Sequence, residues 1–262
     1  MTGFSWALSD AQDRLMGARS LFSVSELYHE NSKILAAAPG IAHTPETLAV
    51  GSSGYKRYTY SRAIDLPAPE LREALAPILR RRSQRDYGPQ LLELSQLANL
   101  AFIASGEGAA ARRPAPSAGG LFPLELYIVA LSVKGLHPGV YHYDVRHHRM
   151  NEIRTGDHRP ELLKAIFIEE AIRGAAAVFI LSGVFGRSKI KYGERAYRFV
   201  LLEAGHVMQN LLMGAQADGL LACPVGGFVD DALNDLVDVD GVEEAVVYTA
   251  MVGTHPLDQT AS

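Results

Sequence analysis

The sequence of 262 residues predicts an α+β fold, and three of its features lead to that class. Short apolar runs of strand length recur beyond residue 120. One long apolar segment near residue 200 has the length and spacing of a helix instead. Helices and strands alternate without the regular strand–helix–strand rhythm of a parallel sheet, which favours α+β over α/β.

Composition excludes several classes of protein. Apolar residues make up 48% and charged residues 21% of the chain, so it is not disordered, collagen-like or a disulfide framework. The formal net charge of −4 gives no basis for general nucleic-acid binding. The start of the chain lacks the features of a signal peptide, and the densest apolar run, residues 174–186, is too short to cross a bilayer. We therefore expect a soluble cytoplasmic protein with neither a membrane nor a nucleic-acid partner.

The chain is expected to have three parts. Residues 1–68 mix short apolar pieces with Gly- and Pro-rich turns and have one helical stretch around 15–27. They are interpreted as an N-terminal arm that packs on the main domain or on a partner. Residues 69–256 form the main domain, and residues 257–262 are expected to be a disordered tail.

Elements of the main domain follow from local signals. Pro77 is expected to kink a helix over residues 70–82. Ser95 is expected to cap a second helix, and Gly106 to end it. The expected strands are residues 124–133, 139–143, 150–154, 177–184 and 245–252.

Residues 194–218 predict a helix that is apolar nearly all round, so we expect it to be buried. Glu203, His206 and Asn210 nevertheless fall on one face of this helix. Buried polar groups need hydrogen-bond partners. The stripe indicates either hydrogen bonds to another helix or a face that meets a cofactor or a subunit interface.

Arg80–Arg85 places four arginines and Ser83 within six residues at the end of a predicted helix. Guanidinium groups donate paired hydrogen bonds to phosphate oxygens, so the segment suits a phosphate. Cations are also favourable at a helix C-terminus, and the segment could equally be a solvated basic face.

Three further segments carry candidate chemistry. Arg112–Pro123 and Cys223–Asp231 each contain paired glycines near proline, which leave backbone amides bare for close approach by a flat ring, although structural turns use the same residues. In the third segment, Lys191 and Tyr192 stand side by side directly before the long helix. Such a pair can handle protons where burial adjusts their pKa values, or it can be the charged start of a helix.

No metal site is expected. His142, His147 and His148 lie on a predicted hairpin, but neighbouring strand residues point to opposite faces. The single cysteine, Cys223, cannot form an internal disulfide, and beside Pro224 it is interpreted as a small buried apolar residue.

Taken in order, these segments resemble the flavin-dependent nitroreductase superfamily, and within it the SagB/ThcOx-type branch of azoline dehydrogenases. The resemblance runs from about residue 24 to 253. The matching stretches are residues 28–33, 81–85, 116–125, 139–144, 192–198, 202–210 and 226–228.

The resemblance implies a nitroreductase-like fold, with a mostly antiparallel sheet flanked by helices, that dimerises and binds FMN at the interface. The arginine segment would hold the phosphate and ribityl parts, with Arg85 reaching toward the pyrimidine end. The loop 116–119 would lie under the isoalloxazine ring, and the backbone of Gly226 and Gly227 would face its N5 atom. The implied cofactor-binding residues are Arg81, Ser83, Arg85, Arg113, Pro116, Ser117, Ala118, Gly119, Gln209, Gly226 and Gly227.

The resemblance also implies the reaction. An azoline ring becomes an azole by losing a hydride to the flavin and a proton to a base, and Lys191 or Tyr192 would be that base, with the other orienting the ring. Oxygen would reoxidise the flavin. The implied partners are an azoline-containing peptide, a second copy of the chain, and a cyclodehydratase or carrier protein.

Two departures from the wider superfamily affect this interpretation. The end of the domain, residues 251–256, has no Lys or Arg for the phosphate, so anchoring falls on Arg80–Arg85. Gly120 and Phe122 stand where other members often carry Asn and Gln, which weakens the case for plain nitroreductase activity. Two alternatives remain: an NAD(P)H-dependent nitro or quinone reductase, and a flavin-bearing scaffold in a heterocyclase complex.

Overall fold

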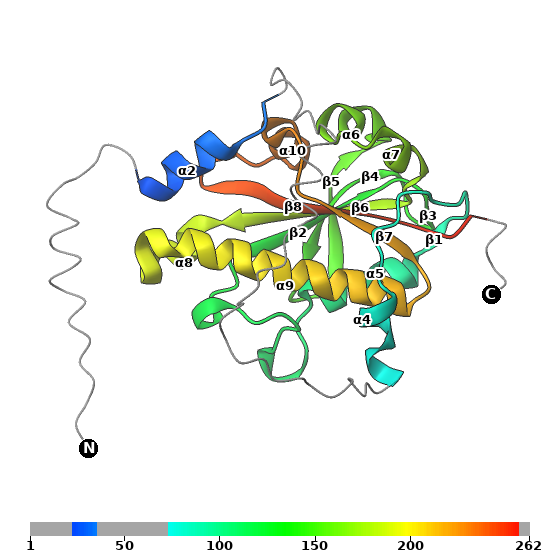
Figure 1. Ribbon diagram of the computed structural model, residues 1–262, viewed down its shortest axis with the longest axis horizontal. Coiled ribbons are helices and arrows are strands. Elements are labelled where there is room, and N and C mark those ends of the chain that lie inside the picture. Colours follow the sequence, from blue (N-terminus) through cyan, green and yellow to red (C-terminus); the bar gives the residue numbers. More distant parts are fainter. Residues whose placement is uncertain (1–22, 36–72, 257–262) are drawn as a thin grey trace, which may run out of the picture.

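The computed structural model describes residues 23–35 and 73–256 (Figure 1). Most of the expected N-terminal arm and the expected tail, residues 257–262, lie outside the described residues. The expected helix near residues 15–27 is described only from Ser23 onward, where helix α2 spans Val24–Ser32. Among the described residues, no helix is both long enough and apolar enough to cross a membrane.

A six-stranded sheet forms the centre, and every neighbouring pair in it is antiparallel, which confirms the α+β class. The strand order is β5-β4-β2-β6-β8-β7. Their bounds are β2 Leu124–Ala130, β4 Gly139–Asp144, β5 Arg149–Thr155, β6 Ala177–Val184, β7 Leu221–Val225 and β8 Glu244–Gly253. The five expected strands are all present, and β7 is additional, because its Cys-Pro sequence resembles a turn.

The expected strand over 124–133 is shorter than predicted. It ends at Ala130, and β3, Val133–Lys134, pairs instead with β1, Leu92–Glu93, in a separate parallel ribbon. The continuous apolar run conceals this break because both pieces are buried at their start.

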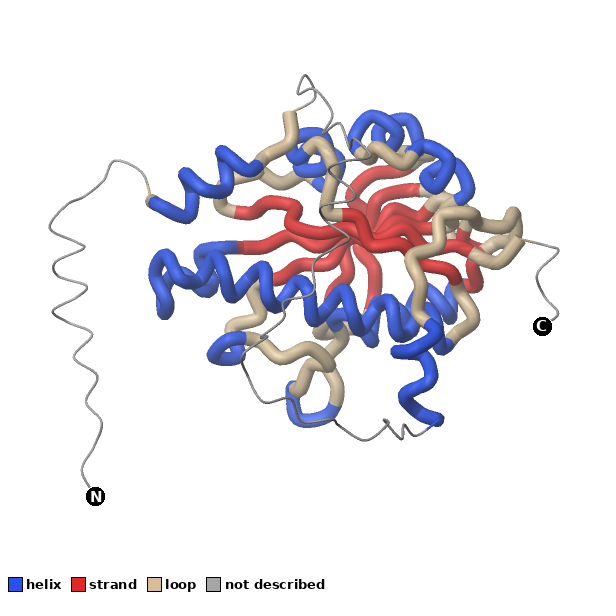
Figure 2. The backbone as a smooth tube through the Cα atoms, viewed as in Figure 1, coloured by secondary structure: helices blue, strands red, loops and turns tan. Residues whose placement is uncertain are grey.

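Helices cover both faces of the sheet, which Figure 2 shows as a layer between two helical layers. One layer holds α4 Ala76–Arg80, α5 Leu94–Ser105, α8 Phe185–Tyr192 and α9 Ala196–Ala217. The other holds α6 Arg159–Ala165, α7 Glu169–Gly174 and α10 Asp230–Val237. Helix α2 lies beside α8 and α10 at one end of the molecule (Figure 1).

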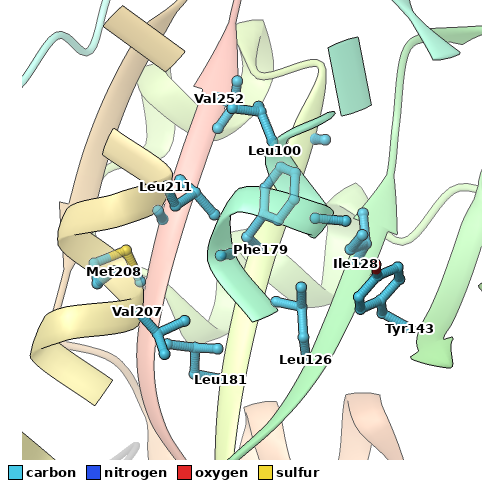
Figure 3. Close-up of a cluster of buried hydrophobic side chains, with 14 of the residues drawn as sticks. Leu100, Leu126, Ile128, Tyr143, Phe179, Leu181, Val207, Met208, Leu211 and Val252 are labelled. Atoms are coloured by element: carbon cyan, nitrogen blue, oxygen red, sulfur yellow. The ribbon is translucent and has the colours of Figure 1, made fainter. Parts of the chain in front are cut away.

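The two cores follow the alternation of side chains along each strand. Leu126 and Ile128 of β2 point into the core under α5 and α9, where Phe179 joins them (Figure 3). Tyr127 and Val129 point to the opposite core, under α6, α7 and α10. Residues adjacent in sequence thus serve different layers, which fixes the register of the central strands.

Two expected helix starts differ in detail. Helix α5 is capped by Glu93 rather than Ser95, because Glu93 and Gln96 form a reciprocal capping box, while Gly106 follows the helix as expected. The kinked helix expected over 70–82 is a single 3₁₀ turn, Glu73–Leu75, followed by α4 with Pro77 in its first turn.

Helix α9 corrects the expectation of burial all round. Leu201 is 38% and Leu202 63% exposed, so one face of the helix is open in the single chain. The polar stripe is divided by the same boundary, since Glu203 is buried whereas His206 is exposed. The stripe therefore crosses from the buried to the exposed side of α9.

Candidate active site

The arginine segment, Arg80–Arg85, leaves α4 and runs beside β7 in the parallel direction. Ser83 bridges to Ala222, and the backbone N–H of Gln84 donates to the Ala222 carbonyl at 3.1 Å. Gly226 and Gly227 follow directly after β7 and are exposed. Extended backbone advances about 3.3 Å per residue, so the Gly pair lies on the order of 13 Å beyond Ser83 along one line.

A cavity of about 490 Å³ opens at the start of this line. Arg80, Arg81, Arg82 and His255 line it, with α9 closing the opposite side, and no Asp or Glu is among its lining residues. Nδ1 of His255 is buried and has no hydrogen-bond partner among the described residues. Within the described residues, Arg80 forms an ion pair with the exposed Glu73 at 3.7 Å. A cluster of three guanidiniums and one imidazole with a single surface carboxylate nearby is suited to an anion.

His255 is a residue that the sequence analysis missed. The end of the domain was noted only for lacking Lys or Arg, and nothing in a lone His-Pro pair signals a site. The backbone carries His255 into the cavity because Thr254 pairs with Gly88, just after the arginine segment. A Cβ on Gly88 would lie 2.0 Å from the His255 carbonyl oxygen, so this approach requires glycine.

Lys191 and Tyr192, at the end of α8, converge on the Gly-rich segment Arg112–Pro123. A Cβ on Gly119 would lie 2.6 Å from the Tyr192 hydroxyl and 2.8 Å from Nζ of Lys191. Gly119 also has a φ of +66°, a conformation in which other residues are strained. The structure thus brings the expected proton-handling pair against the expected ring-binding loop, 116–119.

Hydrogen bonds hold this loop in place. The Phe122 N–H donates to the Ser117 hydroxyl at 2.9 Å, and Arg187 of α8 donates to the Phe122 carbonyl at 3.2 Å. The Arg113 guanidinium lies 4.3 Å from the centre of the Phe122 ring. Arg113 therefore packs against the loop rather than standing free beside it. Pro116 is exposed, while Ser117 and Ala118 are half-buried.

Glu203 of α9 is buried beneath the same loop and is a second missed residue. Burial raises the pKa of its carboxyl, while nearby Ser117 and Arg113 act in the opposite direction. Its only signal in the sequence was the polar stripe on the long helix. Glu203 therefore makes its polar contact with the loop rather than with another helix, so the first interpretation of the stripe, hydrogen bonds to another helix, does not apply to it.

The candidate residues form two groups along α9 within one chain. The arginine cavity includes Leu212 and Gln216, whereas the loop lies against Glu203. At 1.5 Å per residue, Glu203 and Leu212 are on the order of 14 Å apart along the helix. Gln209 stands between them on the exposed face. Each group is joined by its own contacts, and the exposed α9 face separates the two groups.

The three histidines of the hairpin make separate contacts. His142 lies 2.9 Å from Glu125, His147 lies 2.8 Å from Asp144, and His148 lies 2.7 Å from the Tyr143 hydroxyl. Across residues 23–35 and 73–256, no group of three or more His, Cys, Asp or Glu side chains is placed to hold a metal ion.

Comparison with known proteins matches residues 78–254 to the nitroreductase family. MJ1384 of Methanocaldococcus jannaschii, a nitroreductase-related protein, is 32% identical over 177 residues, which cover 67% of this chain and 89% of that protein. The trifolitoxin-processing protein TfxB of Rhizobium leguminosarum bv. trifolii is 28% identical over 55% of this chain. The microcin B17-processing protein McbC of Escherichia coli is 27% identical over 53%. The matches span 40% of TfxB and 53% of McbC.

Two solved structures share the fold. A chain of the E. coli microcin synthetase McbBCD complex, with truncated pro-MccB17 bound, has a TM-score of 0.73 at 19% identity, covering 87% of this chain and 90% of that one. A nitroreductase-related protein from Desulfovibrio desulfuricans in complex with FMN has a TM-score of 0.50 at 16% identity, covering 74% and 91%. The expected fold is thereby confirmed. With its antiparallel sheet, its arginine segment and a family match over 78–254, this chain belongs to the nitroreductase family.

Proposed function

We propose that this protein is an FMN-dependent dehydrogenase that oxidises thiazoline or oxazoline rings to thiazoles or oxazoles in a peptide natural product, either ribosomal or carrier-bound. The observation that carries the proposal is the convergence of Lys191 and Tyr192 on Gly119. TfxB and McbC, two relatives named for processing peptides, support the choice of substrate class.

The residues present fit FMN. The cavity lined by Arg80–Arg82 and His255 suits its phosphate, and the exposed Gly226 and Gly227 lie farther along β7, where no Cβ restricts the approach of a ring. FMN, when bound, supplies a two-electron acceptor, with oxygen as the terminal oxidant. Arg81, Ser83 and Arg85 bind and orient it in this proposal, with the loop 116–119 beneath the ring.

A homodimer completes the site in this proposal. The arginine group and the loop lie at different positions along α9, and between them the helix exposes Gln209, while Leu201 and Leu202 are exposed just before the position of the loop. If two copies pack α9 against α9 in antiparallel fashion, the arginine segment of one copy approaches the loop of the other. The apolar face is then covered and the two groups are united at the interface.

Lys191 and Tyr192 perform the proton step. Aromatisation of an azoline removes two hydrogens from the ring: one leaves as a hydride equivalent to the acceptor, and the other leaves as a proton. The Lys191 amine or the Tyr192 phenolate takes that proton, and the second side chain orients the ring. Tyr192 packs edge-on against Phe199, with ring centres 5.0 Å apart, which restricts how its hydroxyl can turn.

The partners follow from the same relatives. McbBCD is a complex that holds a peptide precursor, so we propose that this chain works with a cyclodehydratase or a carrier protein on a peptide that already contains azolines. Similarity to MJ1384 favours a second candidate, an NAD(P)H-dependent nitro or quinone reductase. A flavin-bearing scaffold with little turnover is the third.

The first experiment identifies the chromophore released from the purified protein by its visible spectrum and its mass. The reduction of the flavin is then followed without oxygen. Bleaching by an azoline peptide, with loss of two hydrogens per ring, supports the dehydrogenase, whereas bleaching by NAD(P)H alone supports the reductase. A protein that remains colourless with added FMN would contradict both.

Lys191→Ala and Tyr192→Phe sharpen this test. Each is expected to lower azole formation about a hundredfold, because general-base catalysis contributes roughly 10²–10⁴. FMN content should stay unchanged, since neither side chain lines the arginine cavity. A protein that acts only as a scaffold would lose nothing in either variant.

A further inference from the structure

Helix α2, which belongs to a segment far from the active site in sequence, contacts the chain on both sides of Lys191 and Tyr192. The Ser25 N–H and the Ser23 hydroxyl donate to one oxygen of Glu194, at 2.7 and 3.0 Å. Nζ of Lys189 donates to Glu26 at 2.7 Å. The two contact points, Lys189 and Glu194, bracket the proton-handling pair.

Other contacts of the bracketed pair are those with Gly119 and the edge-on contact of Tyr192 with Phe199. Helix α8 ends at Tyr192, and Gly193 follows with a φ of +52° and no atom within 4 Å of where a Cβ would stand. Ile190 is 87% exposed, and Lys191 is exposed as well. Phe185 anchors the start of α8 in the hydrophobic core, whereas the end of the helix makes mainly surface contacts.

Polar contacts are also prominent in the packing of α2 on the main domain. Only Ser25 and His29 of the helix are buried, whereas Val24, Leu27 and Tyr28 are exposed. Nδ1 of His29 lies 3.1 Å from the Tyr197 hydroxyl in a buried contact. Directed hydrogen bonds specify an orientation more sharply than apolar burial does, because they act only over a narrow range of distance and angle.

The far end of α2 is tied to the main domain. The Ile34 N–H donates to Asp230 at 2.9 Å, and Nζ of Lys33 lies 3.5 Å from Asp231. Both acidic residues belong to the first turn of α10, a helix in the opposite layer from α8. Helix α2 thus spans from α10 to the end of α8 with both of its ends held.

Electrostatics favours the contact with Glu194. Hydrogen bonds from Ser25 and Ser23 lower the pKa of the Glu194 carboxyl, although burial opposes them. The carboxylate stands at the N-terminus of α2, where the helix dipole favours a negative charge. Lys189 adds a favourable charge from the α8 side.

We propose that α2 is a brace that positions Lys191 and Tyr192 against Gly119, with Glu26 and Glu194 as positioning residues that contact neither substrate nor cofactor. The inference rests on the proposed function, because it assigns the pair its proton-transfer role. It makes a helix from the N-terminal segment a working part of the active site.

Charge reversal tests the brace in the FMN-loaded full-length protein. Glu26→Lys and Lys189→Glu are each expected to lower kcat for azole formation about tenfold, because misplaced catalytic groups react far more slowly. KM and FMN affinity should change little. The double variant, in which the two charges are exchanged, should recover most of kcat. Glu169→Lys, which breaks an ion pair with Arg173 on α7, is the matched control and should leave kcat unchanged.

Hydrogen exchange provides a readout that does not depend on turnover. Amides of residues 186–193 should exchange faster in each single variant and recover in the double variant. Glu194→Gln is a milder second variant, which should show a smaller change in both measurements. Single variants that keep parental kcat and exchange would overturn the brace, and so would a double variant that recovers neither. If the parent protein oxidises no azoline, the proposed function fails, while the exchange data still decide whether α2 holds this segment.

Discussion

The two ends of the candidate site are fixed by different means. The arginine segment lies beside β7, where a backbone bridge at Ser83 and a hydrogen bond to Ala222 set its register. Lys191 and Tyr192 stand at an exposed helix end, held by the loop at Gly119 and by polar contacts from α2. The proposed cofactor end is thus part of the sheet framework, whereas the proposed proton-transfer end depends on a few directed contacts.

This difference has a functional meaning. Backbone pairing within a sheet tolerates changes in most side chains, so the cofactor end should survive many substitutions. The proton-transfer end should be sensitive to single side chains, because each contact accounts for a large share of its position. Substitutions at the two ends should therefore separate FMN binding from turnover.

The largest expected effect comes from Gly119→Ala. A Cβ there would stand under 3.0 Å from both Tyr192 and Lys191 in a backbone conformation that already disfavours it. We expect azole formation to fall about a hundredfold, as much as on removal of either side chain, because a displacement of about 1 Å can lower a rate by that factor. FMN stoichiometry, measured from the visible spectrum, should hold.

Gly120→Ala is the matched control for this prediction. Gly120 has nearly the same φ, +67°, but no atom lies within 4 Å of its Cβ position. Both variants carry the same backbone cost of about 1–2 kcal/mol, so their difference reports the clash with the pair. Equal activity in the two variants would show that Gly119 serves only the turn.

An intermediate effect is expected at the cofactor end. Arg81→Ala should weaken FMN binding about tenfold to a hundredfold, because hydrogen bonds to charged groups contribute roughly 1.5–3 kcal/mol. His255→Ala should weaken it less, since one imidazole among three arginines carries a smaller share. Fluorescence titration of the apoprotein with FMN measures both, and an unchanged Kd for Arg81→Ala would remove the phosphate from this cavity.

The smallest expected effect is the change with pH in how stably α2 docks on the main domain. The pKa values of Glu26 and Glu194 are lowered from 4.5 by their hydrogen bonds, and burial lowers that of His29 from 6.5. Each group therefore stabilises docking above its ordinary pKa and loses that contribution as the pH falls through its folded value. Burial raises the pKa of Asp230, which faces His29, and this opposes the trend.

Exchange rates of the α2 amides measure this dependence. They should rise as the pH falls from 7 to below 4, beyond the intrinsic change in exchange, because the lowered pKa values of these groups make docking weaker as they become protonated. The buried amides of β6 are the internal control. Exchange of α2 that follows β6 across this range would contradict the prediction.

Local patterns predicted most of the fold. The strands at 177–184 and 245–252 appear almost at their expected bounds, since a short apolar run rich in β-branched residues is typical of a buried strand. Strand β7 and helix α8 were missed for different reasons. Pro224 suggests a turn although it lies on an edge strand, and α8 has too few apolar residues to show a helical period.

Most residues of the candidate site stood out in the sequence, but their grouping within one chain did not. Arg81, Gly119, Lys191 and Gly226 stood out as local oddities of charge or of glycine content. Which of them meet depends on the packing of α8 and α9 on the sheet, which no window of sequence contains. Glu203 is an example: its place in the polar stripe showed that it was unusual, but not whether it would face the buried or the exposed side of α9.

The sequence by itself determined the class of fold, the positions of the central strands and the chemical types available to the site. The spacing of apolar residues is a local property of the sequence, and it decides which face of a helix or strand is buried. Only the tertiary structure placed His255 among the arginines, Lys191 and Tyr192 against Gly119, and α2 across the end of α8. Those contacts join residues far apart in the chain, and their geometry follows from strand register and helix packing rather than from any single segment.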